Sequence, residues 1–370
     1  MFHRLALTCM LCVAAVSLGC NKNKTAGTGG ITSSAAPDDT PVFTLAWSEY
    51  PSWSVFGVAA EEGLIDGAEG EIGELEAKWK VDIVLNLADY DTCIGQYGSS
   101  EADAVCITNM DIMAPSLSRP AVAILPTSTS DGADACIVVE SIATIDDLKG
   151  VPTYGLEKSV SQYCFERVLE LNGKNPEDFP FQHMDPAAAA TAMQAGQEDI
   201  QSIMVWNPFV MQTLRDRQDC KVLFDSTAIP EEIIDMVVVG KDVLDKPGGK
   251  RFAYAILDTF YAVNQLIDSP DTRDETLVAL GAKFSKLGLE DMKTVVTQTK
   301  FYNTPEKGLA LMQSDKFRQT TMPAVAEFLV THEMAEEKPT FGFDDDSVQL
   351  NFTTQFLQDI HDGIDPAAVE

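Results

Sequence analysis

The residues best suited to hold a small solute follow a short apolar run in the first third of the chain. Residues 104–107 have the pattern of a buried strand, which ends at three polar side chains, Thr108, Asn109 and Asp111. A helix is predicted next, over 111–118. In open α/β sheets, ligands bind where a strand ends and the following helix begins. Asn109 alone could simply cap that helix, but a cap does not account for Thr108 and Asp111 as well.

The same strand-end rule selects further polar and aromatic side chains as ligand-binding candidates. They are Tyr50, Trp53, Asp89, Ser128, Ser159, Ser161, Trp206 and Asn207. The three aromatic residues Tyr50, Trp53 and Trp206 could cover the flat faces of a planar solute, although any one of them is more often a packing residue. Ser159 and Ser161 begin a predicted helix whose N–H groups could receive an oxygen atom, or they simply cap it.

The charges around these residues indicate the class of solute. Asp89, Asp91 and Asp111 are acidic, and Lys158 is the nearby cation. A pocket for a carboxylate, sulfonate or phosphate normally presents an arginine to the anion. Acceptor-rich, aromatic surroundings favour a small neutral amide or a small amine. Urea is the first choice, with Asp111 as its anchor and the Ser161 hydroxyl facing its carbonyl.

The first 41 residues have the pattern of an export and anchoring segment. Residues 1–19 combine a basic start, an apolar run and a small-residue end, which is typical of a signal peptide. The junction before Cys20 resembles a lipoprotein cleavage site, so Cys20 is the expected lipidation site; an ordinary signal that happens to contain a cysteine is the alternative. Residues 20–41 are predicted to be a flexible leash. The protein is therefore expected in the periplasm or cell envelope, held to the membrane by lipid alone.

Composition and charge exclude several classes of partner. The chain is 45% hydrophobic, as globular proteins are, and its formal net charge is −31. A field of that sign repels nucleic acid and anionic lipid surfaces. The cysteines beyond Cys20 show no C-x-x-C spacing and no histidine at ligand spacing, so no metal is expected. Cys136 and Cys220 lie in strands predicted to be neighbours and are the best candidates for a disulfide.

Alternating strand and helix patterns divide the remaining chain into two lobes. Residues 42–130 are the first part of lobe one and 131–227 are lobe two, each predicted to be a doubly wound, mostly parallel sheet of the α/β class. Residues 228–370 return to lobe one with one more strand and then become wholly helical, packing on lobe one. Two crossings, near 126–134 and 225–230, predict a hinge.

The order of these parts, with three short stretches, resembles a known family. Residues 145–150, 192–199 and 205–209 are similar to segments of bacterial ABC-transporter solute-binding lipoproteins of the nitrate/sulfonate/taurine type, and 108–111 to a subgroup labelled as urea transporters. The resemblance implies the two-lobed type II periplasmic-binding-protein fold and a monomer that delivers solute to permease and ATPase subunits. It implies no catalytic residue and no cofactor. Asn207 stands where the family carries an acid.

Three alternatives stay open at this point. The first is an anion-binding protein of the same family, for nitrate, sulfonate or taurine. The second is an enzyme resembling hydroxymethylpyrimidine synthase, in which His183 at a strand end could take part. The Cys-rich signature of that branch is absent, and no Ser/His/Asp order or glycine-rich phosphate loop stands out. The third is a sensor module that passes its bound state to a membrane kinase, which would use the same pocket.

Overall fold

The computed structural model describes residues 33–370, which belong to one compact unit. The predicted signal peptide, Cys20 and most of the predicted leash lie outside the described residues. Inside the predicted leash, β1 (Ser34–Ala35) pairs with β3 (Glu71–Ile72), so backbone pairing begins before residue 42. No helix of the described part is both long and apolar enough to cross a membrane.

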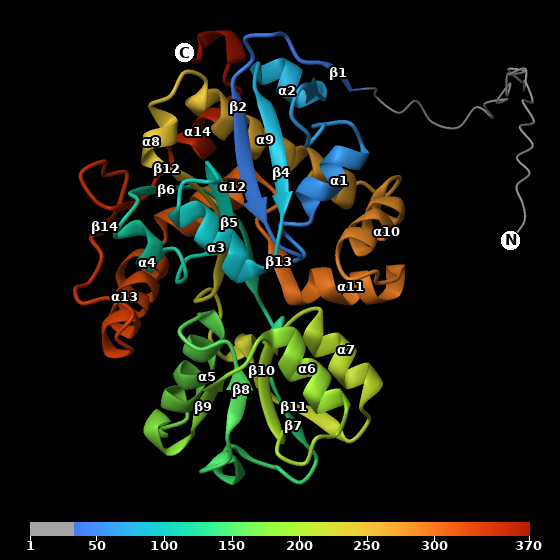
Figure 1. Cartoon of the computed structure of the whole chain (residues 1–370), viewed down its shortest axis with the longest axis vertical. Helices are drawn as coiled ribbons and strands as arrows, with labels where there is room; N and C mark the ends of the chain where they lie inside the picture. The colour runs from blue at the N-terminus through green and yellow to red at the C-terminus, as the bar shows by residue number, and fades with distance from the viewer. Residues whose placement is uncertain (1–32) are drawn as a thin grey trace, which may run out of the picture. The chain divides into compact units, whose positions relative to one another are not determined.

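The larger sheet, which we call lobe one together with its helices, has the strand order β14-β15-β6-β12-β5-β2-β4, with β13 paired to β6 (Figure 1). Its strands are β2 (Val42–Trp47), β4 (Asp82–Leu87), β5 (Ala104–Thr108), β6 (Ala121–Ser130), β12 (Ile234–Gly240), β13 (Thr299–Phe301), β14 (Phe341–Phe343) and β15 (Leu350–Phe352). The central strand β5 is buried along its whole length because helices cover both faces of the sheet, as its unbroken apolar sequence predicts.

Eleven α-helices of the described chain accompany this sheet. They are α1 (Val55–Glu61), α2 (Glu74–Trp79), α3 (Tyr90–Gly98), α4 (Met113–Ser116), α8 (Lys241–Leu244), α9 (Gly249–Asp268), α10 (Arg273–Lys283), α11 (Leu289–Gln298), α12 (Pro305–Gln313), α13 (Met322–Thr331) and α14 (Gln355–His361). The long helix α9 buries the predicted periodic apolar stripe, including Phe252, Ile256 and Phe260. Its burial against α1, α2 and the sheet makes it the central helix of this lobe.

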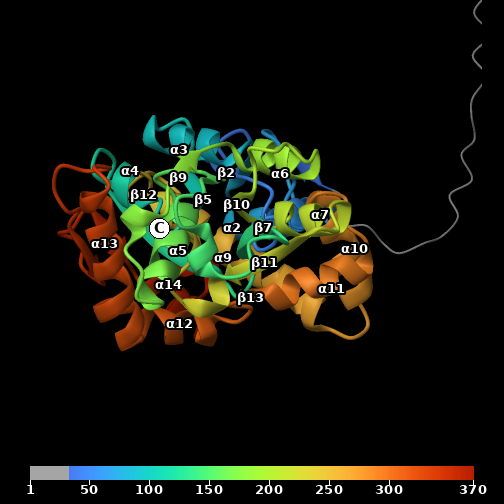
Figure 2. The same ribbon diagram turned by 90° about the horizontal axis from the view of Figure 1, so that it is seen from below.

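The smaller sheet, lobe two, has the order β11-β7-β10-β8-β9. Its elements are β7 (Asp134–Val139), β8 (Thr153–Gly155), α5 (Val160–Leu171), β9 (Phe181–His183), α6 (Pro186–Gln194), β10 (Ser202–Trp206), α7 (Phe209–Asp216) and β11 (Cys220–Asp225). Helix α5 lies on one face of this sheet, and α6 and α7 lie on the other (Figure 2). Side chains of β7 alternate between the two faces: Cys136 and Val138 pack on the α5 side, whereas Ala135 and Ile137 pack with α6 and α7.

The α/β class is confirmed, but both sheets are mixed rather than mostly parallel. In lobe one β2 is parallel to β4 and β5, whereas β12 is antiparallel to β5 and β6. The reason is topological: β6 leads out to lobe two, and β12 brings the chain back in the opposite direction. In lobe two β7 is antiparallel to both neighbours. The expectation of a wholly helical end was also wrong, because β13, β14 and β15 extend the first sheet.

The proposed disulfide does not form. The five cysteines in the described part are all free. Cys136 lies opposite Phe224 in the β7–β11 pair, and Cys220 lies opposite Val139, three residues along the strand. Three residues span about 10 Å of strand, whereas bridged Cα atoms lie within about 7 Å. The two thiols also face different sides of the sheet.

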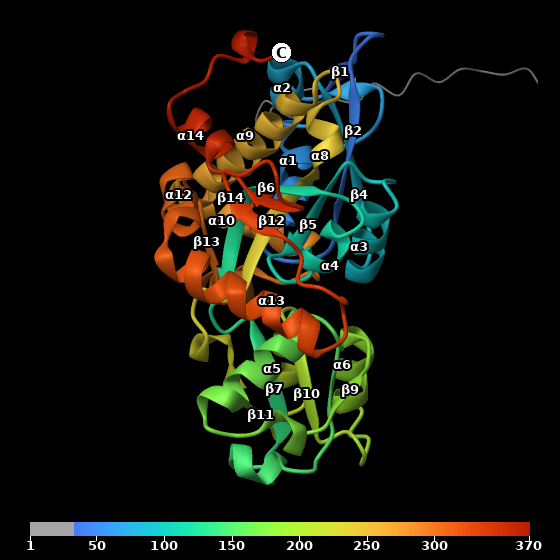
Figure 3. The ribbon, with the colours of Figure 1, turned by 90° about the vertical axis from the view of Figure 1, so that its left-hand side faces the viewer.

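Two chain crossings join the lobes. The first is short, because β6 continues to Ser130 and β7 begins at Asp134. The second passes through the 3-10 turn Ser226–Ala228 before β12. A further contact lies beside them, where α13 of lobe one packs on α5 of lobe two (Figure 3). There Tyr163 stacks edge-on against Phe328 at 5.3 Å.

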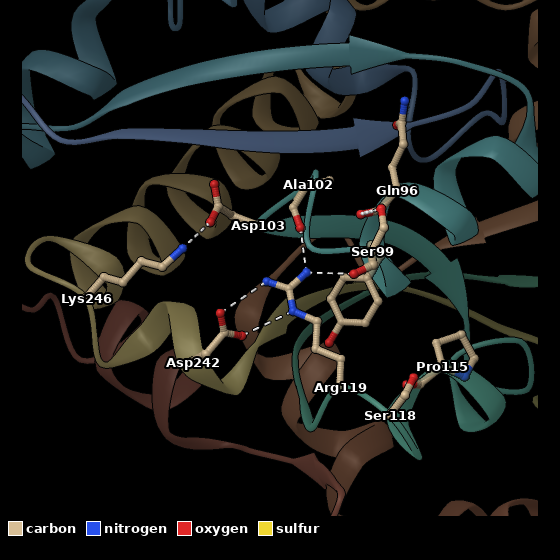
Figure 4. A network of polar contacts seen from close by, with 10 residues as sticks. Gln96, Ser99, Ala102, Asp103, Pro115, Ser118, Arg119, Asp242 and Lys246 are labelled. Atoms are coloured by element: carbon tan, nitrogen blue, oxygen red, sulfur yellow. Dashed lines mark hydrogen bonds and ion pairs between the residues drawn. The ribbon is translucent and has the colours of Figure 1, made fainter.

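A buried arginine fixes the start of β5, at the opposite end from its polar residues. Arg119 Nη1 donates to the carbonyl oxygens of Tyr97 and Ala102, both at 2.7 Å, and its Nε donates to Asp242 at 3.2 Å (Figure 4). Its guanidinium lies 4.7 Å from the centre of the Tyr97 ring. These bonds tie together α3, the segment before β5 and the start of α8.

Candidate functional site

A small cavity lies where the two lobes meet. It is lined from both lobes by Ser48, Tyr50, Trp53, Tyr90, Thr108, Asp134, Val160, Trp206, Ile233 and Asp235. Lobe one supplies the end of β5, the start of α3 and the start of β12; lobe two supplies the start of β7, the start of α5 and the end of β10. Of the residues predicted from the sequence, Tyr50, Trp53, Thr108 and Trp206 meet here.

The size of the cavity limits what can occupy it. The centre of a water molecule can move through about 20 Å³ of it. The outer heavy atoms of urea lie about 1.3 Å from its carbon, and a group of about that size is the largest that so small a space can enclose. Any larger solute has to extend beyond it.

Two carboxyl groups face this cavity and neither has a basic partner there. Asp134 and Asp235 are 2% and 1% exposed. Burial raises the pKa of Asp134 to about 6, and the nearby charge of Asp111 adds to the shift. Burial likewise raises the pKa of Asp235 well above its usual value, with Asp134 and Asp111 adding to it. Three buried acids thus repel one another at this site.

Asp111 lies behind the cavity wall rather than in it. Its Oδ2 accepts from the Tyr90 hydroxyl at 2.7 Å and from Thr108 Oγ1 at 2.8 Å. Burial raises the pKa of Asp111 to about 6, while these two bonds and the Val160 N–H at the start of α5 act in the opposite direction. Asp111 therefore positions two residues of the cavity, and it does so beside the first N–H groups of a helix from lobe two.

Aromatic rings form most of the apolar wall. Trp53 stacks on Tyr90 with ring centres 5.5 Å apart, and Tyr50 lies 4.9 Å from Trp53. From lobe two, Trp206 meets the Tyr90 ring edge-on at 6.0 Å. The Trp53 Nε1 is buried and has no hydrogen-bond partner among the described residues. A buried donor without a partner is costly, so this N–H is available to an acceptor atom of a ligand.

Ser128 supports the cavity without lining it. Its hydroxyl donates to Asp235 Oδ2 at 2.5 Å and lies 2.8 Å from Ser52 Oγ. Asp235 is thereby held in place by β6, the neighbouring strand. From the sequence, Ser128 was predicted to bind the ligand. In the structure Ser128 instead holds Asp235, a cavity residue that was not predicted.

The two asparagines that were predicted to bind the solute make hydrogen bonds within the protein. Asn109 bonds to the backbone, and Asn207 bonds across the two lobes. Asn109 donates through Nδ2 to the carbonyl of Glu232 at 3.2 Å and accepts from the Ile234 N–H at 3.0 Å, which fixes the start of β12. Asn207 donates to Gln298 Oε1 at 2.8 Å, linking the end of β10 to the end of α11. Neither side chain is among those that line the cavity.

The two predicted serines begin α5. Ser159 is its N-cap: its hydroxyl accepts from the Ser161 N–H at 3.1 Å and donates to the Leu156 carbonyl at 2.7 Å. The capping alternative is therefore the one observed for Ser159. Ser161 is fully buried, and its hydroxyl has no partner in the protein. Between them, Val160 lines the cavity, so the start of α5 reaches the site although neither serine side chain lines it.

An open cleft lies on the other side of Tyr90 and Trp206. It is lined by Ser48, Glu49, Leu87, Ala88, Asp89, Tyr90, Asp91, Leu156, Asp185, Pro186, Ala187, Trp206 and Phe209, and the centre of a water molecule can occupy about 320 Å³ of it. Asp89 caps α3 by accepting from the Thr92 N–H at 2.9 Å, which lowers its pKa. The predicted residue Asp89 thus belongs to this outer cleft.

Six of the ten cavity-lining residues were not selected from the sequence, among them Tyr90, Asp134 and Asp235. Tyr90 lies between Asp89 and Asp91 in the sequence, and only these two acids were considered as part of the pocket. Asp134 and Asp235 each stand within an otherwise apolar stretch at the start of a strand. An acid in such a run is costly to bury and needs an explanation. An acid within an apolar run can be recognised in the sequence, and this criterion would have selected Asp134 and Asp235.

Residues 33–370 contain no group of three or more histidine, cysteine, aspartate or glutamate side chains arranged to hold a metal ion. The three carboxyl groups of the site are therefore not grouped as metal ligands. Tyrosine, tryptophan and carboxylate side chains can bind a solute through hydrogen bonds, charge and ring faces.

Comparison with known proteins identifies the fold class. No family model and no curated protein sequence matches the chain. Among solved structures, the periplasmic aliphatic sulphonate binding protein SsuA from Escherichia coli gives a TM-score of 0.61 at 18% identity, over 80% of this chain and 94% of that chain. The alkanesulfonate-binding protein SsuA from Xanthomonas axonopodis pv. citri, bound to MOPS, gives 0.60 at 15%, over 83% and 96%.

A Candida albicans gene product, CA3427, described as having the generic periplasmic binding protein fold, gives a TM-score of 0.58 at 14% identity, over 80% of this chain and 92% of that chain. At these identities the likeness concerns the fold. The chain has the α/β periplasmic-binding-protein fold that the sequence resemblance implied.

Proposed function

We propose that this protein is the extracytoplasmic solute-binding component of an ABC importer. It captures a small polar solute rich in N–H donors, urea or another small amide or amine, between its lobes. One observation carries the proposal: both lobes line a cavity with two buried carboxyl groups and no basic side chain. The solute would then pass to permease and ATPase subunits.

The chemistry of the cavity favours this solute over an anion. Asp134 and Asp235 accept hydrogen bonds, and a sulfonate or nitrate would instead need donors and positive charge. The neighbours named for sulfonates share the fold, which by itself does not carry their ligand to this chain. Fold and ligand chemistry vary independently within such folds.

A binding role also fits better than catalysis. His183, the residue that an enzyme reading would use, is exposed at the end of β9 and lines neither the cavity nor the outer cleft. The sensor alternative would use the same cavity and differs only in its partners. We further propose that Cys20 carries the lipid, that the protein is a periplasmic monomer, and that it meets the membrane through that lipid alone.

A thermal-shift screen of the full-length protein tests the proposal. Ureas, amides, amines, sulfonates and nitrate are compared at equal ionic strength. A ligand that binds only the folded state raises the melting temperature by mass action. A shift with amides or amines supports the proposal, and a shift with sulfonates or nitrate alone supports the anion-binding alternative. No shift with any of them contradicts solute capture by this cavity.

A further inference from the structure

Acidic side chains line both the cavity and the cleft outside it. Asp134 and Asp235 face the inner cavity, and Asp111 lies directly behind it. The outer cleft adds four more acids, which are Glu49, Asp89, Asp91 and Asp185. No lysine, arginine or histidine lines either space. A solute that enters therefore meets carboxyl groups from the mouth of the cleft to the end of the cavity.

Lys158, the cation expected nearby, is exposed and lines neither space. Burial raises the pKa of Asp91 at the outer cleft, and the nearby charge of exposed His183 acts in the opposite direction. Three other basic residues of the described chain are engaged elsewhere. Arg119, the one buried basic residue of the described chain, bonds carbonyl groups at the far end of β5. Arg167 pairs with Glu232 at 3.1 Å, and Lys300 pairs with Asp131 at 2.7 Å. None of these can neutralise the carboxyl groups of the cavity without breaking its present contacts. The charge of the site is thus left for a ligand to balance.

The walls of the cavity suit a cation for a second reason. Tyr50, Trp53, Tyr90 and Trp206 all line it, and the faces of such rings attract cations. Independently, Trp53 is 3% exposed and its Nε1 has no hydrogen-bond partner among the described residues. This N–H is a donor only, so it marks a place for a ligand or its water but does not itself favour a cation.

We propose that the cavity selects a small organic cation whose charged group is planar and of guanidinium or amidinium size. The carboxyl groups of Asp134 and Asp235 receive its N–H donors, the aromatic rings cover it, and any larger part of the solute extends past Tyr90 and Trp206 into the outer cleft. This proposal rests on the solute-binding function above and specifies the charge of the solute.

Three planar molecules of nearly equal size separate charge from shape. Guanidinium carries +1, urea is neutral and nitrate carries −1, and each has four heavy atoms in a plane. Their affinities for the full-length protein are measured by calorimetric titration at low millimolar concentration, with sodium chloride holding ionic strength constant. Acetamidinium and acetamide form a second pair. We expect each cation to bind at least tenfold more tightly than its neutral partner, and nitrate to show no binding.

Variants test whether the two carboxyl groups are responsible. Asp134→Asn and Asp235→Asn keep the size of the side chain and remove its charge, and each should weaken guanidinium about ten- to a hundredfold. Asp271→Asn, at an exposed turn between α9 and α10, is the matched control and should leave the affinity unchanged. Melting curves show whether each variant is folded before it is titrated.

The outcomes separate this inference from the function on which it rests. If urea or acetamide binds as tightly as its cationic partner, the charge inference is overturned while solute capture stands. If nitrate binds best, the inference is overturned in favour of the anion alternative. If no molecule of the wider screen binds, both fail. If guanidinium binds but the folded Asp134 and Asp235 variants match the parent, the assignment to this cavity is overturned.

Discussion

The Tyr90 hydroxyl links Asp111 to the end of β5, since it donates to Asp111 Oδ2 at 2.7 Å and accepts from the Thr108 N–H at 3.0 Å. One phenol therefore holds the last residue of a strand and the carboxylate three residues beyond it. The ring of the same residue separates the inner cavity from the outer cleft. The position of Thr108 and the hydrogen bonding of Asp111 thus both depend on the Tyr90 side chain.

Replacing Tyr90 by phenylalanine keeps the ring and removes the hydroxyl. We expect Tyr90→Phe to lower the free energy of unfolding by about 1.5–3 kcal/mol, because a hydrogen bond to a charged group is lost in a buried place. Differential scanning calorimetry measures the change. Tyr154→Phe, a half-buried tyrosine in β8, is the control and should change little. Equal melting temperatures for parent and Tyr90→Phe would contradict this role.

Asp111 should matter for the solute as well as for the fold. We expect Asp111→Ala to weaken binding of the solute about ten- to a hundredfold, because Tyr90 and Thr108 lose their common acceptor beside the cavity. Asp89→Ala removes an exposed acid of the outer cleft and should cost far less. Calorimetric titration compares the two. If Asp111→Ala binds as the parent does, Asp111 is a structural residue of the strand end only.

Acidification should remove the destabilisation that Asp111 and Asp134 cause in the unliganded fold. The pKa values of Asp111 and Asp134 rise to about 6 in the fold, so the folded state holds more protons than the unfolded state between pH of about 4 and 6. Stability from these groups is therefore full below about pH 4 and is lost as pH rises through about 6. Thermal unfolding followed by calorimetry measures this stability. Unfolding by urea or guanidinium is avoided because both are candidate ligands.

A matched variant isolates this effect from the many other carboxyl groups of the chain. Asp134→Asn removes one group with a raised pKa. It should melt a few degrees above the parent at pH 7.5 and close to the parent at pH 4. A variant that melts below the parent at pH 7.5 would show that the charge of Asp134 stabilises the unliganded fold, contrary to our account.

The lipid assignment concerns a residue outside the described part of the chain. Expression of Cys20→Ser should move the protein from the membrane fraction to the soluble fraction, because the thiol that would carry the lipid is gone. Immunoblots of the two fractions measure this. The protein staying with the membrane after the substitution would rule out Cys20 as the anchor.

Two crossings between the lobes predict closure upon the solute. The present cavity is narrow, so a free protein has to open to admit a molecule. Small-angle scattering should therefore show a smaller radius of gyration at saturating solute than without it. An unchanged radius would favour a rigid pocket. The Asn207 amide donates to Gln298 across the lobes at 2.8 Å. Asn207 is therefore a position at which a substitution should shift the equilibrium between the open and closed forms.

The arrangement of elements was predictable where the apolar pattern is local. The expected strand at 104–107 is β5, within one residue, and the helix expected to begin at Ser159 and Ser161 is α5. The helix expected over 111–118 forms only as Met113–Ser116, with Pro115 inside it. The short strands β13 and β15 could not be read locally, because three residues carry no period and pair with β6 across more than a hundred positions.

The site was predictable in part for the same reason. Strand ends are visible in a sequence, so Thr108, Tyr50 and Trp206 were found. The pairing of Asp134 with Asp235 in one cavity was not, because it depends on two strands that start in different lobes and meet only through the crossings. Which of several serines caps a helix and which supports a carboxylate likewise depends on long-range packing.

The four acids of the outer cleft have a kinetic consequence. Charges of one sign around a narrow mouth raise the local concentration of an oppositely charged solute, and such steering accelerates encounter by about 10- to 1000-fold at low salt. Salt shortens the reach of this field to about 8 Å at physiological strength. The association rate of a cation should then fall as salt rises, while its dissociation rate, set by the enclosed Asp134 and Asp235, stays nearly constant. The protein would thus discriminate between solutes of different charge twice, once through the association rate and once through the dissociation rate.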